Sequence, residues 1–88
     1  MFRLWGKIFK DARLVKDITI EDDSDDTRTH KIFRALDQIC HAFDLASPIW
    51  LDSSVRYFKQ HDRVRFTRDN FIEKIDFDYL EIEVLEED

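Results

Sequence analysis

The sequence predicts a two-layer α+β domain in which an antiparallel sheet is covered by helices. Three observations predict this class: both ends of the chain alternate apolar and polar residues, a central segment has helical periodicity, and 88 residues fit a single domain, 1–88. The expected strand order is 14–21, 2–9, 77–86, with 63–66 as a candidate minor strand. We expect a main helix at 27–45 and a short helix at 53–60.

The first and last strands are expected to pair, because one is basic and the other acidic. Segment 2–9 has apolar residues on both faces, which is typical of a central strand. An antiparallel register with paired residue numbers summing to about 86 sets Leu4 opposite Ile82 and Arg3 opposite Glu83. That register predicts one continuous apolar face beneath the helix.

A hairpin is expected to join the first two strands. The residues between them lack the Asn-Gly pair of a two-residue turn, so a three-residue loop closed by Phe9 and Arg13 is predicted. This loop sets Leu4 opposite Ile18 and Ile8 opposite Leu14.

The main helix is predicted from apolar residues that recur every three or four positions. The acidic run 21–26 before it should be a solvated connector that caps the helix. A calcium loop starting at Asp22 would need Gly and Glu where the chain has Thr27 and Phe33, so no metal site is predicted. The apolar face should contain Ile32, Phe33, Leu36, Ile39, Cys40 and Phe43.

Several classes of site are excluded by composition. With one glycine, the chain cannot form a Gly-rich phosphate loop, a dinucleotide-binding fingerprint or a nucleophile elbow, and no cofactor is expected. The single cysteine, Cys40, is expected to be a buried core thiol. Together with the lack of a secretory signal, it predicts a reducing, cytoplasmic location. Apolar runs are too short for insertion into a membrane.

One basic stretch could contact nucleic acid. The net charge of -6 and the neighbouring acidic residues disfavour a polyanionic partner, so this interpretation is an alternative rather than the leading one. Its candidate contacts are Arg56, Lys59, Arg63, Arg65 and Arg68.

The leading hypothesis is a non-enzymatic protein-interaction module, which works through an exposed sheet edge or an aromatic face. Its partner would be a second copy or an unidentified protein, and Trp5, Phe77 and Tyr79 are the candidate surface residues. A second alternative treats residues 2–10 as an amphipathic helix on a membrane surface. A small enzyme with scattered acid and base residues is also considered, although no convergent polar group predicts one.

Overall fold

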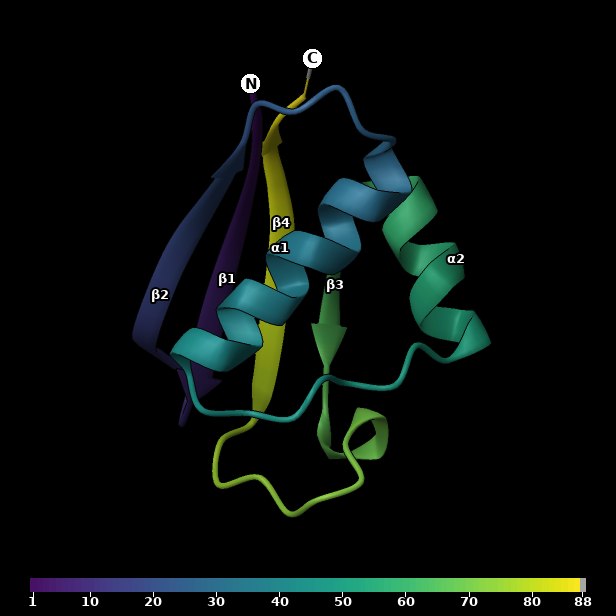
Figure 1. Ribbon diagram of the computed structural model, residues 1–88. Coiled ribbons are helices and arrows are strands. Elements are labelled where there is room, and N and C mark those ends of the chain that lie inside the picture. The colour runs from purple at the N-terminus through teal and green to yellow at the C-terminus, as the bar shows by residue number, and fades with distance from the viewer. Residues whose placement is uncertain (88) are drawn as a thin grey trace.

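The computed structural model describes residues 1–87 and contains a four-stranded antiparallel sheet with two helices packed on one face (Figure 1). The strand order β2-β1-β4-β3 confirms the predicted α+β class and strand order, and residues 63–66 form the fourth strand. The strands are β1 (Phe2–Lys10), β2 (Arg13–Asp22), β3 (Arg63–Phe66) and β4 (Tyr79–Glu86). The helices are α1 (Arg28–Ala42), α2 (Asp52–His61) and the short 3₁₀ turn η1 (Arg68–Asn70).

The core lies between the sheet and the two helices. Alternate residues of each strand face it, because successive side chains in a strand point to opposite sides. Gly6 of β1 lies directly against Ile39 of α1: a Cβ atom added at Gly6 would be 2.6 Å from Cγ2 of Ile39. The most buried large side chains are Phe2, Leu4, Ile39, Phe66, Leu80 and Ile82.

The register between β1 and β4 differs from the prediction by two residues. The strands are adjacent and antiparallel as expected, but Leu4 pairs with Val84 and Gly6 with Ile82. A shift of two residues leaves every side chain on its predicted face, so the apolar pattern is satisfied in either register. The observed register places Lys7 directly opposite Glu81, a match that the predicted register made only diagonally.

The predicted three-residue hairpin loop is wrong. Lys10 pairs with Arg13, and the two residues between them both have positive φ, 54° at Asp11 and 63° at Ala12. Positive φ at both central positions is the geometry of a tight hairpin turn whose twist matches that of the strands. The pairing is irregular between Ile8 and Phe9: Phe9 pairs with Leu14, but Ile8 pairs with Lys16. Leu4 consequently lies opposite Ile20 rather than Ile18.

Helix α1 begins after Thr27, whose side-chain oxygen accepts a hydrogen bond from the backbone N–H of His30 at 3.2 Å. The helix ends at Ala42, three residues before the predicted end. Cys40 is buried as predicted, and burial, with the nearby charge of Asp37, raises the pKa of its thiol to about 11.

The expected position of Phe33 in the core is wrong, because its side chain is 46% exposed. The buried stripe of α1 is centred on Ile32, Leu36 and Ile39, and Phe33 lies on the side of that stripe that faces Trp50. The Phe33 side chain therefore lies between α1 and α2 rather than in the core.

The amphipathic-helix interpretation of residues 2–10 is wrong, because these residues form β1 with a paired strand on each side. Among residues 1–87, no helix is long and apolar enough to cross a membrane.

Candidate functional site

The face of the sheet opposite the helices, called here the open face, has charged side chains on all four strands and aromatic side chains on β1 and β4. Cross-strand pairing places Lys7 between Asp17 and Glu81, and Arg65 on the other side of Glu81. Acidic and basic residues therefore alternate across the four strands. On this face of β1, the cations Arg3 and Lys7 alternate with the aromatic residues Trp5 and Phe9.

Lys7 lies at the centre of the open face, although only 5% of it is exposed. Its Nζ is 2.8 Å from carboxylate oxygens of both Glu81 and Glu83, and it lies 3.9 Å from the centroid of the Trp5 ring. Burial alone would lower the pKa of Lys7, but the hydrogen bonds and charges of the two glutamates outweigh it and raise the pKa. Burial would likewise raise the pKa of Glu81, but hydrogen bonds from Lys7 and Arg65 lower it.

Aromatic rings border this charged centre. The indole N–H of Trp5 donates to Asp17 at 2.9 Å, and the rings of Phe9 and Tyr79 stack with centroids 5.0 Å apart. The Arg65 guanidinium lies 4.6 Å from the Tyr79 ring centroid. Two of the three candidate surface residues, Trp5 and Tyr79, thus share the open face.

The third candidate surface residue lies elsewhere. Phe77 precedes β4 and packs against the core. Its ring meets the Phe71 ring edge to face, with the two ring centroids 6.0 Å apart.

The candidate nucleic-acid contacts are distributed over three elements. Arg63 and Arg65 lie on the open face of β3, where Arg65 Nε is 3.0 Å from Glu81. Arg56 and Lys59 lie on α2, and Arg68 begins η1. Lys59 borders the space between the two helices. The five cations therefore do not form one surface: Arg63 and Arg65 lie on the open face, and the others lie on α2 and η1.

Strand β2 forms one edge of the sheet and, among residues 1–87, pairs only with β1. It is ten residues long, and each of its residues is exposed or half-buried. Ile18 and Ile20 face the helix layer and line a shallow groove beside α1. Their side chains are therefore accessible from the outer edge of the sheet.

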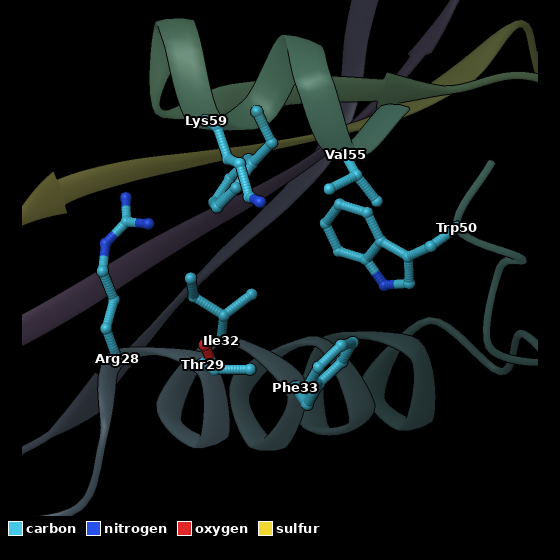
Figure 2. A pocket seen from close by; sticks show the side chains of 8 residues that line it. Arg28, Thr29, Ile32, Phe33, Trp50, Val55 and Lys59 are labelled. Carbon is cyan, nitrogen blue, oxygen red and sulfur yellow. The ribbon is translucent and has the colours of Figure 1, made fainter. Parts of the chain in front are cut away.

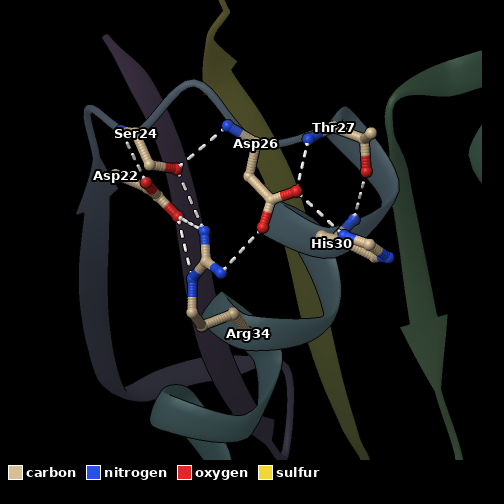
Figure 3. A network of polar contacts seen from close by, with 6 residues as sticks. All are labelled: Asp22, Ser24, Asp26, Thr27, His30 and Arg34. Atoms are coloured by element: carbon tan, nitrogen blue, oxygen red, sulfur yellow. Dashed lines mark hydrogen bonds and ion pairs between the residues drawn. The ribbon is translucent and has the colours of Figure 1, made fainter.

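The acidic connector before α1 is held by one arginine, as Figure 3 shows. Arg34 approaches Asp22 to 2.6 Å and Asp26 to 3.1 Å, and its Nη2 donates to the hydroxyl oxygen of Ser24 at 3.1 Å. Hydrogen bonds from His30, the Thr27 backbone and Arg34 lower the pKa of Asp26 to about 2. Hydrogen bonds from Arg34 and Ser24 also lower the pKa of Asp22. The carboxylates stabilise the connector by binding this guanidinium.

A pocket of about 180 Å³ lies between α1 and α2. Figure 2 shows Ile32 and Phe33 on its α1 side, Val55 and Lys59 on its α2 side, and Trp50 across one end. Its complete lining is Arg28, Thr29, Ile32, Phe33, Trp50, Val55, Phe58 and Lys59.

Trp50 organises the wall of this pocket. Its ring makes edge contacts with Phe33, Phe58 and Phe66 at centroid distances of 6.0, 5.7 and 4.9 Å. Its buried Nε1–H has no hydrogen-bond partner within the described chain. A buried donor without an acceptor is energetically unfavourable by roughly 1–3 kcal/mol.

Sequence reasoning identified neither the pocket nor the buried Lys7. Trp50 lies outside the regular elements, and the pocket exists only because α1 and α2 pack side by side. In the sequence of β1, Lys7 alternates with apolar residues, as a lysine that faces solvent would. Side chains of neighbouring strands bury it, so its burial cannot be predicted from the sequence of β1 alone.

Across residues 1–87, no cluster of three or more His, Cys, Asp or Glu side chains could hold a metal ion. Comparison with protein-family models, curated proteins and solved structures finds no match.

Proposed function

We propose that the protein is a non-enzymatic interaction module that self-associates by pairing β2 with β2 of a second copy. The observation that carries the proposal is the outer edge of β2, which offers ten residues of extended backbone with one neighbouring strand in the described chain. Unpaired N–H and C=O groups on such an edge are a template for another strand. Pairing two copies would extend the four-stranded sheet across both.

The sequence of β2 complements itself in one antiparallel register. With Thr19 at the two-fold axis, Ile18 lies opposite Ile20 of the second copy, and Lys16 lies opposite its Asp22. These pairs share the helix side of the sheet, because directly opposed residues in an antiparallel pair point to the same face. The register joins the two accessible isoleucines of each copy and flanks them with opposite charges.

On the open face, the same register brings Asp17 near Glu21 of the second copy. Both carboxylates already have partners within their own chain: Asp17 accepts from the Trp5 indole, and Glu21 lies 2.8 Å from Arg3. These contacts reduce the repulsion between the two acids. We therefore expect a weak, concentration-dependent dimer, as is usual for a small interface.

The first test is the mass in solution as a function of concentration. Sedimentation equilibrium should approach twice the 10.7 kDa of one chain over a range on the order of 1 µM to 1 mM. Lys16→Glu should shift the equilibrium toward monomer, because it places a negative charge opposite Asp22 of the second copy. Arg13→Glu, at the hairpin end of β2 and outside the proposed pairing, is the matched control and should dimerise as the unaltered protein does. A monomer throughout this range would overturn the proposal.

A second test reads the register directly. Opposed residues in an antiparallel pair have Cα atoms about 4.5–5.5 Å apart, within the range that a disulfide spans. Thr19→Cys should therefore form a disulfide-linked dimer under mild oxidation, whereas Lys16→Cys should not, because its opposite residue is Asp22. Equal crosslinking by the two variants would contradict this register.

A further inference from the structure

The pocket is lined by residues of α1 and α2. Helix α2 and strand β2 lie on opposite sides of the molecule (Figure 1). A ligand in this pocket and a second copy at β2 would therefore bind independently. The chemistry of the pocket follows from three properties: its volume, the rings in its wall and the charges at its rim.

The volume of about 180 Å³ limits the ligand to a small one. A protein cavity of about 150 Å³ lined by apolar side chains accommodates a benzene ring. Pockets for drug-sized ligands are larger, about 300–1,000 Å³. The space between α1 and α2 therefore fits a single six-membered ring with a short substituent.

The wall favours an aromatic ring over an aliphatic chain. Phe33, Trp50 and Phe58 all line the pocket, and Trp50 meets the other two rings edge to face. A ring placed among them can make further edge-to-face contacts, which contribute beyond burial of area alone. Phe33 is 46% exposed, so a ligand would also cover apolar surface that now faces water.

The rim favours a negative charge. Arg28 and Lys59 border the pocket from its two helices (Figure 2). Arg28 already contacts Asp62 at 2.8 Å and Glu87 at 2.9 Å. Lys59 is exposed and has no ion-pair partner within residues 1–87, so its ammonium group is available to a carboxylate.

We propose that this pocket binds a small aromatic monocarboxylate. The ring lies among Phe33, Trp50 and Phe58, and the carboxylate lies at the mouth beside the Lys59 ammonium. Both parts of the ligand are required, because the ring supplies the buried area and the anion selects for the charged rim.

Phenylacetate is the probe for the test, with Trp50 fluorescence as the readout. The chain has two tryptophans, and Trp5 lies on the open face of the sheet. Trp5→Phe therefore leaves Trp50 as the single reporter. Phenylacetate should change its fluorescence saturably, with a dissociation constant on the order of 1 mM. No saturable change up to about 20 mM would overturn the proposal.

The charge is tested by a neutral analogue and by a lysine variant. Phenylacetamide should bind about fivefold more weakly than phenylacetate, and Lys59→Gln should weaken phenylacetate binding by a similar factor. Lys74→Gln is the matched control, because Lys74 is exposed and does not line the pocket. Equal affinity for acid and amide, with no effect of Lys59→Gln, would overturn the anionic specificity.

The location is tested by filling the pocket. Val55 is only half-buried, so Val55→Phe should occupy part of the cavity and weaken binding at least about tenfold without unfolding the chain. Circular dichroism of the same sample establishes that it is folded. If Val55→Phe is folded and binds phenylacetate normally, the ligand lies elsewhere and the proposal fails.

Discussion

Lys7 Nζ lies 2.8 Å from a Glu81 carboxylate oxygen, in the middle of a sheet face that neither α1 nor α2 covers. Both side chains are less than one-tenth exposed, because Trp5 and the neighbouring strands exclude water from them. A charge pair removed from water in this way is favourable only when both members are present. Any register that separated Lys7 from Glu81 would deprive each of these buried charges of a partner, so this pair favours the observed register of β1 against β4.

Removing one member of this pair should destabilise the fold. Lys7→Met is expected to reduce the free energy of unfolding by about 2–3 kcal/mol, because Glu81 then keeps, among residues 1–87, only Arg65 as an ion-pair partner. Arg3→Met is the control: Arg3 pairs with Glu21 while 46% exposed, and its loss should cost at most about 1 kcal/mol. Urea denaturation of both variants measures the difference. Equal losses would show that the Lys7 pair is energetically no different from a surface pair.

Stability should fall in acid because of carboxylates whose pKa values are lowered by folding. The pKa of Glu81 lies below its ordinary 4.5, and that of Asp26 is lowered from 3.8 to about 2. Such groups stabilise the folded state above their unfolded pKa values, and this contribution is lost as the pH falls through the folded ones. The unfolding free energy should therefore decline below about pH 4.5.

Arg34→Met should make that decline shallower between about pH 4 and pH 2. Asp22 loses the main donor that lowers its pKa, and Asp26 loses one of three, after His30 and the Thr27 backbone. Arg13→Met, at the hairpin, is the control and should leave the pH profile unchanged. Thermal melts across this range provide the measurement. An unchanged profile for Arg34→Met would contradict the assignment of the acid sensitivity to the connector.

Gly6 should not tolerate a side chain. A Cβ atom there would lie 2.6 Å from Ile39 Cγ2, so Gly6→Ala should destabilise the protein by about 1–3 kcal/mol. In an Ile39→Ala background, the space is open and the same substitution should cost much less. A double-mutant cycle measured by chemical denaturation gives the coupling. Additive effects would mean that α1 and β1 can separate without cost.

The hairpin turn offers a stabilising substitution. Ala12 has φ of 63°, a left-handed conformation that is unfavourable for a residue with a Cβ atom. Ala12→Gly should therefore raise the free energy of unfolding by about 0.5–1 kcal/mol. Ala42→Gly, in the last turn of α1, should have the opposite effect because glycine disfavours helix. A loss of stability in Ala12→Gly, measured by thermal unfolding, would contradict the strain assigned to the turn.

The period-two pattern of the strands was sufficient to predict their faces but not their register. Along most of both β-pairs around β1, the observed pairing is shifted by two residues from the prediction, and Ile18, Ile20 and Val84 still face the helices. At the hairpin the shift is one residue, so Leu14 lies opposite Phe9 rather than Ile8 and is on the open face. A shift by an even number of residues keeps each side chain on the same face, so the alternation of apolar and polar residues cannot distinguish the two registers. The register depends on the Asp11–Ala12 turn, on the irregularity after Ile8 and on the contact between Lys7 and Glu81, all of which require two strands to be in place.

The sequence by itself determined the α+β class, the position of α1 and the burial of Cys40, because each follows from the periodicity of single segments. It also determined the strand order, because the first and last strands carry complementary charge and the first has apolar residues on both faces. Only the tertiary structure decided that Phe33 borders a pocket and that Lys7 is buried. The physical reason is that periodicity describes one segment relative to its own axis. A pocket and a buried charge depend on which other segments lie beside it.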